Sequence, residues 1–340
     1  MASVDKEIMI SNKLAIVSVS LGQHSSHTLP HKIAAAAQNG ISGLEITYPD
    51  LEFYSIGLSI PILDAALKIK DLCSENGIIV ISLASFQNFE GHVSPLKERL
   101  AKASSWLAIA RNLGAEYLQV PSSYDSNING DHEVIVSELR QLSDLAGASR
   151  PVIKIANENL AWSTHCTLWQ DALKIVCEVD RDNFGLCLDS FHLSVVLWAD
   201  PFSLSGQQPN SNKRLEESLQ LFVKNCPLDK IFYIQLSDGE LLDPPYSESH
   251  PWYDRDLAVG HVWSNEARPF PLENDYGAYM PVQTIAQEFL VDKGFSGWVS
   301  LETFDRRMRE EKNDPTQNAR RAVSAWWHLK QRLLAANHGS

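Results

Sequence analysis

Short apolar runs alternate with longer amphipathic stretches along almost the whole chain. The apolar runs are rich in Val, Ile and Leu, as buried strands are. We expect strands at residues 14–19, 43–47, 78–83, 116–120, 152–158, 184–189, 231–235 and 298–302. Between and after them, apolar residues recur at helical spacing. These stretches predict helices at about 30–39, 61–76, 96–113, 132–146, 167–179, 212–224, 281–293 and 315–334.

Glycine follows four of the predicted helices, where a helix end favours a residue in the left-handed conformation. These glycines are Gly40, Gly77, Gly114 and Gly294. Strands that alternate with helices pair in parallel, and eight such units favour a closed barrel over an open sheet. We therefore predict an α/β fold of the (β/α)8 TIM-barrel type. One domain over residues 1–340, with its core at about 13–334, accommodates the chain.

Two connections are too long to be simple turns. One spans residues 194–212 after the sixth predicted strand, and the other spans 237–279 after the seventh. Loops of this length usually act as lids or binding loops. In a TIM barrel the active site lies at the C-terminal ends of the strands, and both loops are expected on that face.

The last four predicted strands each end on a residue with a side-chain oxygen. These residues are Glu158, Asp189, Gln235 and Glu302. A single acidic residue at a strand end usually caps a helix or pairs with a lysine, but four in order indicate a ring of oxygen ligands. Oxygen ligands without thiolates suit Mn²⁺, Mg²⁺ or Co²⁺ better than structural zinc. We predict one divalent metal ion, and the neutral amide of Gln235 leaves room for an anionic substrate oxygen.

Three further residues are expected at the same barrel mouth. His192 follows Asp189 by three positions, and it could bind the metal, act as a general base or hydrogen-bond the loop. Glu45 ends the second strand and could be a catalytic acid, a contact of the substrate or a partner that orients a ligand. Glu90, after the third strand, has the same ambiguity.

The second long loop contains candidate substrate-binding residues, which are His250, Ser264 and Arg268. An arginine can hold a carboxylate with two parallel hydrogen bonds, and Ser264 could support it. Composition alone is equally compatible with an exposed arginine in a folded loop.

Composition and charge limit the class of partner and the cellular compartment that we expect. The formal charge of −13 argues against nucleic acid as the partner, and the five cysteines form no CxxC pair. Widely spaced cysteines of odd number favour reduced thiols inside the cell. The N-terminus lacks the pattern of a signal peptide, and no apolar run is long enough to span a membrane. We expect a cytoplasmic protein whose partner is a small molecule.

Several stretches, spread nearly end to end, resemble one family. They are Gly43–Ile46, Phe89–Gly91, Asn183–Asp189, Gln235–Glu240, Gly277–Pro281 and Gly297–Glu302. The chain resembles the 3-dehydroshikimate dehydratases of the xylose isomerase-like TIM barrels. The resemblance implies that Glu158, Asp189, Gln235 and Glu302 bind the metal. It also implies that His192 is the active-site histidine and that Ser264 and Arg268 hold the substrate.

The reaction implied by this resemblance is the loss of water from 3-dehydroshikimate, which gives protocatechuate. A divalent ion on the ketone and the adjacent hydroxyl would acidify the proton between them and stabilise the enolate. We expect His192 to remove that proton and Arg268 to orient the substrate through its remote carboxylate.

The chain departs from the family at positions that we expect to line the pocket. Asn265 stands where relatives have a second arginine, Ala156 and Asn157 replace aromatic residues, and Gln87 and Asn88 also differ. A metal-dependent isomerase or epimerase of another hydroxy-ketone is therefore the main alternative. An inactive binding barrel and a nuclease are disfavoured, because the ligands are retained and no basic face is visible. The sequence is compatible with a homo-oligomer.

Overall fold

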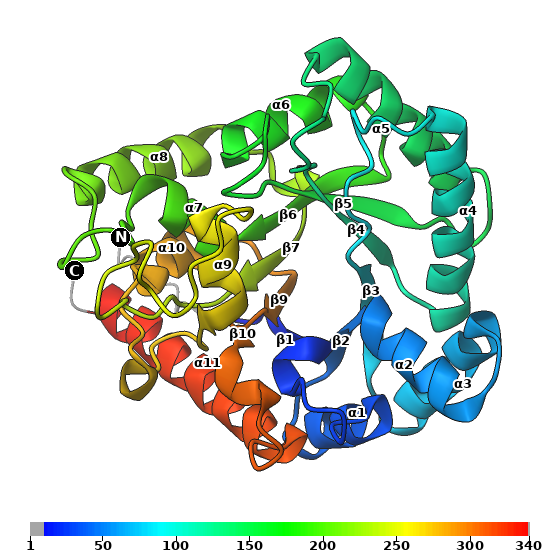
Figure 1. The fold of residues 1–340 in the computed structure, drawn as a ribbon, viewed down its shortest axis with the longest axis horizontal. Coiled ribbons are helices and arrows are strands. Elements are labelled where there is room, and N and C mark those ends of the chain that lie inside the picture. Colours follow the sequence, from blue (N-terminus) through cyan, green and yellow to red (C-terminus); the bar gives the residue numbers. More distant parts are fainter. Residues whose placement is uncertain (1–9, 339–340) are drawn as a thin grey trace, which may run out of the picture.

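A computed structural model describes residues 10–338, and it shows a closed barrel of eight parallel strands in the order β1-β2-β3-β4-β5-β6-β7-β9 (Figure 1). The strands are β1 (Lys13–Val17), β2 (Gly43–Thr47), β3 (Ile79–Ala84), β4 (Tyr117–Pro121), β5 (Lys154–Glu158), β6 (Phe184–Asp189), β7 (Ile231–Leu236) and β9 (Trp298–Leu301). Pairing of β1 with β9 closes the barrel. The predicted (β/α)8 fold is confirmed.

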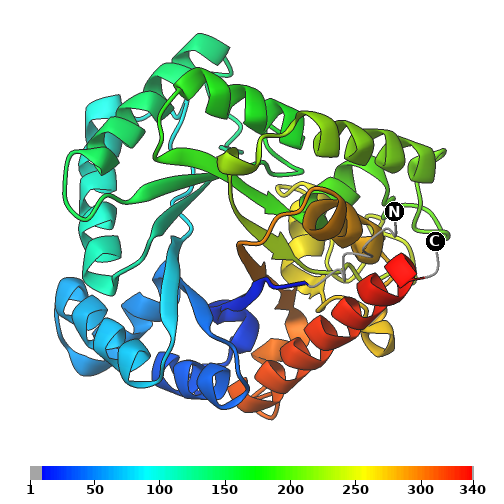
Figure 2. The same ribbon diagram turned by 180° about the vertical axis from the view of Figure 1, so that it is seen from behind.

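Helices surround the barrel, as the front and back views show (Figures 1 and 2). They are α1 (Leu29–Gln38), α2 (Tyr48–Leu58), α3 (Ile62–Glu75), α4 (Leu96–Leu113), α5 (His132–Gly147), α6 (Trp169–Val179), α7 (Ser190–Leu197), α8 (Ser211–Asn225), α9 (Val259–Glu266), α10 (Val282–Ala286) and α11 (Pro315–His338). A π-helical segment, Gln287–Asp292, continues α10. Within residues 10–338, no helix combines the length and apolarity that crossing a membrane requires.

The four glycines predicted to follow helices all have positive φ angles. The values are 79° for Gly40, 69° for Gly77, 71° for Gly114 and 74° for Gly294. A side chain would strain this conformation, so glycine ends the helix and turns the chain toward the next strand. These predicted helix ends are confirmed.

A small cluster of Tyr117, Ala156, Cys187 and Tyr233 packs apart from the main core. Three of its members precede a strand-end residue by two positions: Ala156 precedes Glu158, Cys187 precedes Asp189 and Tyr233 precedes Gln235. Residues two apart on a strand face the same side. The cluster therefore forms a packed layer beneath the polar residues at the barrel mouth.

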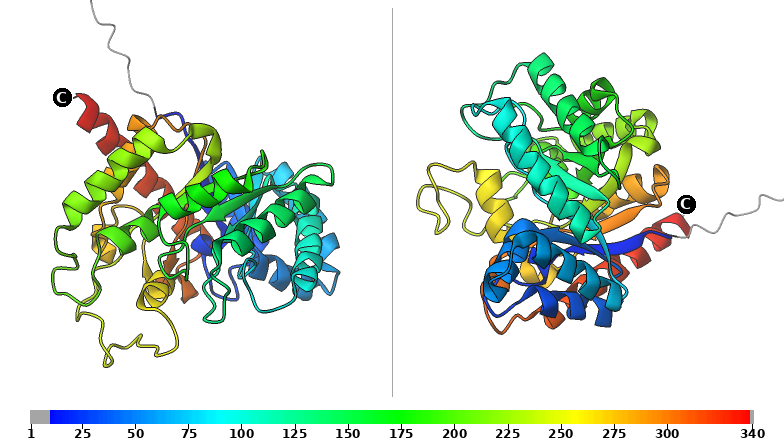
Figure 3. Two further views of the ribbon diagram at one scale, coloured as in Figure 1. Left: turned by 90° about the horizontal axis from the view of Figure 1, so that it is seen from above. Right: turned by 90° about the vertical axis from the view of Figure 1, so that its right-hand side faces the viewer.

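The two long connections contain helices that the sequence pattern did not predict. Helix α7 begins directly after β6, where the Asp189 side chain accepts the Phe191 N–H at 2.7 Å. Helix α9 lies inside the loop after β7, which projects from one end of the barrel (Figure 3). Helix α2 was also missed, because its apolar residues, among them Phe53 and Ile56, are not confined to one face.

The loop after β7 is fixed by a buried aspartate and a short strand pair. The Asp238 carboxylate accepts backbone N–H groups of Gly239, Leu272, Tyr279 and Met280. Burial raises the pKa of Asp238 to about 6, although these four hydrogen bonds lower it. Strand β8 (Ala267–Arg268) also pairs antiparallel with β10 (Phe304–Asp305). The loop is thus a folded unit that presents Arg268.

Candidate active site

A cavity of about 440 Å³ brings together residues from strand ends, α4 and the loop after β7. Its polar lining includes Glu158, His192, Ser264, Asn265, Arg268 and Glu302. Aromatic walls come from elsewhere in the chain, including Trp106 on α4, Trp162 after β5 and Phe304 on β10. Parallel strands bring their C-terminal ends to one mouth, which explains how residues far apart in the sequence meet here.

Three buried carboxylates meet at the barrel mouth. Glu158 Oε2 accepts from Gln119 Nε2 at 2.8 Å, whereas its Oε1 atom has no hydrogen-bond partner among residues 10–338. Burial raises the pKa of Glu158 well above its usual value, and the nearby Glu302 and Asp189 raise it further. Burial also raises the pKa of Glu302, to about 8. Like charges buried this closely require a cation or protons to balance them.

The donor set fits a divalent ion. One ligand atom each from Glu158, Asp189 and His192 lie within 4.8 Å of one another. The buried Glu158 carboxylate keeps one oxygen, Oε1, without a hydrogen-bond partner among residues 10–338, so the group can still take a cation or a proton. Carboxylate oxygens are the ligands that hard cations prefer. This group therefore has the composition of a metal site.

Gln235 lies at the same cluster, as the sequence pattern suggested. Its Nε2 donates to Glu45 Oε1 at 3.0 Å and to Glu302 Oε1 at 3.1 Å. Its Oε1 accepts from Cys187 Sγ at 3.3 Å. Ligation through the amide oxygen would therefore require the amide to turn over, which exchanges two atoms of nearly equal size.

Arg268 is buried against the carboxylates rather than exposed in the loop. Its Nη2 atom pairs with Asp189 Oδ2 and lies 2.9 Å from Glu302 Oε2. Its Nε donates to Ser237 Oγ at 2.7 Å, and its Nη1 donates to Ser264 Oγ at 3.3 Å. The guanidinium partly balances the negative cluster, and Nη1 keeps a second N–H that none of these contacts uses.

His192 is buried beside the same carboxylates. Its Nε2 atom lies 3.5 Å from Glu158 Oε1 and 3.5 Å from Asp189 Oδ2. The Ala161 N–H donates to Nδ1 at 3.1 Å, so the neutral ring carries its hydrogen on Nε2. Burial lowers the pKa of His192 to about 3, although Asp189 opposes the shift. The ring is therefore a neutral hydrogen-bond donor toward the cluster.

Glu45 lies below the cavity and not among its lining residues. Its carboxylate accepts from Ser82 Oγ at 2.8 Å, Tyr233 Oη at 2.8 Å and Gln235 Nε2 at 3.0 Å. Glu45 thus contacts Gln235 from beneath. This placement fits a residue that orients Gln235.

Replacing Glu45 with glutamine should lower the affinity for a divalent ion about 10- to 100-fold, the usual effect of losing a partner that orients a ligand. Turnover should recover in large part at saturating metal, because Glu45 does not line the cavity. Metal titration monitored by activity and by calorimetry checks this. A variant that stays inactive with the metal site full would instead give Glu45 a direct catalytic role.

Two predicted substrate-binding residues lie outside the cavity lining. Glu90 is buried, where its Oε1 accepts the Ser123 N–H at 2.6 Å and lies 3.2 Å from His165 Nε2. His250 packs its ring against Tyr246 and Trp252 in the loop after β7. Both positions support the surrounding loops in this structure.

Only some of the positions at which the chain departs from the family line the cavity. Asn265 and Gln87 line the cavity, as expected. Asn88, Ala156 and Asn157 do not line it, and the last two are buried within β5.

Sequence reasoning missed several residues of the cavity wall. His261 on α9 stacks on Trp162 with ring centroids 4.9 Å apart and an interplanar angle of 4°. Lys102 on α4 also lines the cavity. A lone histidine in a loop and a lysine on a helix carry no spacing signal, and only tertiary packing brings them to the mouth.

Comparison with known proteins places the chain in a family. The model of the xylose isomerase-like TIM barrel family matches residues 33–329, which is most of the chain. The chain belongs to this family. A xylose isomerase-like TIM barrel/4-hydroxyphenylpyruvate dioxygenase fusion protein of known structure shares the fold, with a TM-score of 0.74 and 26% identity. The match covers 95% of this chain and 43% of that chain.

Three relatives are named 3-dehydroshikimate dehydratase, among them proteins from Neurospora crassa and Pseudomonas putida. The protein from Neurospora crassa is 35% identical over 339 residues, which cover 95% of this chain and 94% of that protein. The protein from Pseudomonas putida is 27% identical over 322 residues, which cover 93% of this chain but only 41% of that longer protein. The family resemblance inferred from the sequence is confirmed.

Proposed function

We propose that the chain is a metal-dependent dehydratase that converts 3-dehydroshikimate into protocatechuate. The observation that carries the proposal is the group of three buried carboxylates, Gln235, His192 and Arg268 at one cavity. Such a group suits a small anionic hydroxy-ketone. Similarity to the Neurospora crassa dehydratase over nearly the full length of both chains supports the same substrate.

Glu158, Asp189, Gln235 and Glu302 would hold one divalent ion, Mn²⁺, Mg²⁺ or Co²⁺. When bound, such an ion supplies a positive charge that stabilises negative charge on the ketone oxygen. Burial of the four side chains strengthens this effect, because charges interact more strongly away from bulk solvent.

Glu158 is the best-placed base. It lines the cavity, and its Oε1 atom has no hydrogen-bond partner within the described chain. In this scheme the other oxygen of Glu158 would hold the ion, and Oε1 would take the proton from the carbon next to the ketone. It then returns this proton to the departing hydroxyl, so that water leaves and the carboxylate is restored.

His192 would assist the departure of that hydroxyl. Its Nε2 atom lies 3.5 Å from Glu158 Oε1 and from Asp189 Oδ2, and its low pKa keeps the ring neutral. A neutral imidazole can donate a hydrogen bond to oxygen as negative charge develops there. The general-base role expected from the sequence would require a hydrogen on Nδ1, where the Ala161 N–H already donates. We therefore assign His192 as a donor.

Arg268 and Ser264 would bind the substrate carboxylate. Arg268 lies against the rings of Phe191 and Phe304, whose centroids are 4.7 and 5.4 Å from its guanidinium carbon. These ring contacts and the bond to Ser237 fix the direction of Nη1, which lies beside Ser264 Oγ. A carboxylate at this point would accept from both groups and orient the carbons that react.

The direct test is incubation of the metal-loaded protein with 3-dehydroshikimate and, separately, with neutral ketoses. Ultraviolet absorbance reports protocatechuate, and chromatography reports isomerised sugars. We expect protocatechuate from the first and no product from the second. Turnover of a neutral ketose alone would identify an isomerase or epimerase and overturn the proposal.

A further inference from the structure

We propose that Glu240 is a positioning residue that holds Arg268 and Ser264 in the cavity wall. The inference rests on the proposed function, because it concerns how the substrate carboxylate is bound. Glu240 follows β7 and does not line the cavity. It therefore acts through other residues, and three sets of contacts connect it to them.

The Glu240 backbone contacts both parts of the carboxylate-binding segment. Its N–H donates to Ala267 O at 2.9 Å, directly before Arg268. Its carbonyl accepts from Trp263 Nε1 at 3.0 Å, directly before Ser264. The end of β7 thus holds the residues next to Ser264 and Arg268.

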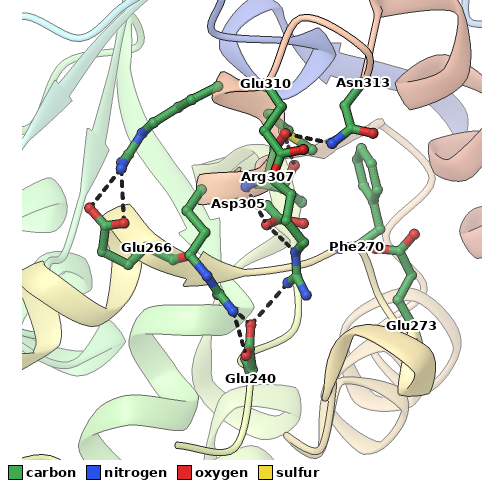
Figure 4. A network of polar contacts seen from close by, with 12 residues as sticks. Glu240, Glu266, Phe270, Glu273, Asp305, Arg307, Glu310 and Asn313 are labelled. Carbon is green, nitrogen blue, oxygen red and sulfur yellow. Dashed lines mark hydrogen bonds and ion pairs between the residues drawn. The ribbon is translucent and has the colours of Figure 1, made fainter. Parts of the chain in front are cut away.

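The Glu240 side chain connects the end of β7 to the segment after β9. Arg306 donates through Nη1 and Nη2 to the two carboxylate oxygens, at 2.7 and 3.0 Å. Arg307 Nη2 donates to Oε2 at 2.9 Å, and Figure 4 shows Arg307 reaching both Glu240 and Asp305. The carboxylate side chain is 17% exposed, so solvent screens these bonds only in part.

This segment also reaches Arg268 through strand pairing. Arg306 and Arg307 directly follow β10, in which Phe304 pairs with Arg268 and Asp305 pairs with Ala267. Phe304 in turn lies against the Arg268 guanidinium. Glu240 therefore holds β8 from one side by its backbone and from the other side through the arginines after β10. Removing its charge should let Arg268 move relative to Ser264 while the barrel remains folded.

The test uses two probes, protocatechuate and catechol, which differ by the carboxylate alone. Calorimetry on the metal-loaded protein measures the ratio of their dissociation constants. A charge-assisted pair is worth about 1.5–3 kcal/mol, so the wild type should prefer protocatechuate by about 10- to 100-fold. Arg268→Gln should abolish most of this preference. Glu240→Gln should reduce the preference for protocatechuate about tenfold with little change in catechol binding. In the Arg268→Gln background, Glu240→Gln should have no further effect on this preference.

Glu310→Gln is the matched control, because Glu310 lies in the same segment but pairs with the exposed Lys312 at 2.8 Å. It should leave the ratio unchanged. Arg306→Gln replaces Glu240→Gln if the latter does not fold, and the same reduction is expected.

The outcomes distinguish failure of the Glu240 positioning role from failure of the proposed role of Arg268. Equal weakening of both probes by Glu240→Gln, or an undiminished effect in the Arg268→Gln background, would overturn the positioning role. A wild type without carboxylate preference would instead contradict the proposed function of Arg268.

Discussion

Replacing Asp189 with asparagine should lower kcat/KM for 3-dehydroshikimate by about 10³-fold or more. Loss of one anionic ligand removes several kcal/mol of stabilisation from the developing charge, and about 4 kcal/mol corresponds to this factor. Asparagine keeps the oxygen that accepts the Phe191 N–H, so α7 should still begin at the same residue. Steady-state kinetics and metal analysis after dialysis measure the effect, and the variant should retain little metal.

Asp131→Asn is the matched control for this substitution. Asp131 caps α5 by accepting the Glu133 and Val134 N–H groups, and it lies outside the cavity lining. Its replacement should leave metal content and turnover within about twofold of the wild type. An exposed helix cap contributes about 1 kcal/mol to folding stability and does not act on the active site. If Asp189→Asn retained full metal content and activity, Asp189 would not be a ligand.

Replacing His192 with alanine should reduce kcat by about 10²- to 10³-fold, the usual effect of losing a donor to a developing oxyanion. Because Glu158 is the proposed base, removal of the proton next to the ketone should continue. Recovered 3-dehydroshikimate should therefore incorporate deuterium from D₂O although little protocatechuate forms. Mass spectrometry measures the exchange, and absorbance measures the product.

His132→Ala controls for the loss of an imidazole, because His132 pairs with Glu178 on the outside of the barrel and should not affect either rate. The comparison distinguishes two roles of His192. Loss of exchange together with loss of product would return His192 to the general-base role that the sequence suggested. Persistent exchange supports the hydrogen on Nε2 that the Ala161 contact favours.

The fold was predictable because its strands are buried on both faces and read as apolar runs. Strands β2 and β6 agree with the predicted ranges to the residue, whereas β5 begins at Lys154 rather than at 152. Helix α7 was missed because Ser190–Leu197 is almost entirely buried and shows no polar face. Helix α9 was missed because it is a short segment inside a loop rich in Pro, Trp and Tyr.

The centre of the site was more predictable than its walls. Parallel pairing brings Glu158, Asp189 and Gln235 to one end of the barrel. Their positions at strand ends were therefore enough to predict that they lie together. The sequence could not indicate that Arg268 pairs with Asp189, because the contact depends on how the loop folds around Asp238. Walls such as Trp106 and His261 come from helices whose orientation only tertiary packing sets.

The central claim is that the divalent ion and the carboxylate cluster together dehydrate 3-dehydroshikimate. The most direct measurement is protocatechuate formation by one protein sample before EDTA treatment, after it, and after the addition of Mn²⁺. We predict that activity disappears with EDTA and returns with the metal, and that Asp189→Asn is not restored. Undiminished protocatechuate formation by metal-free protein would contradict the account.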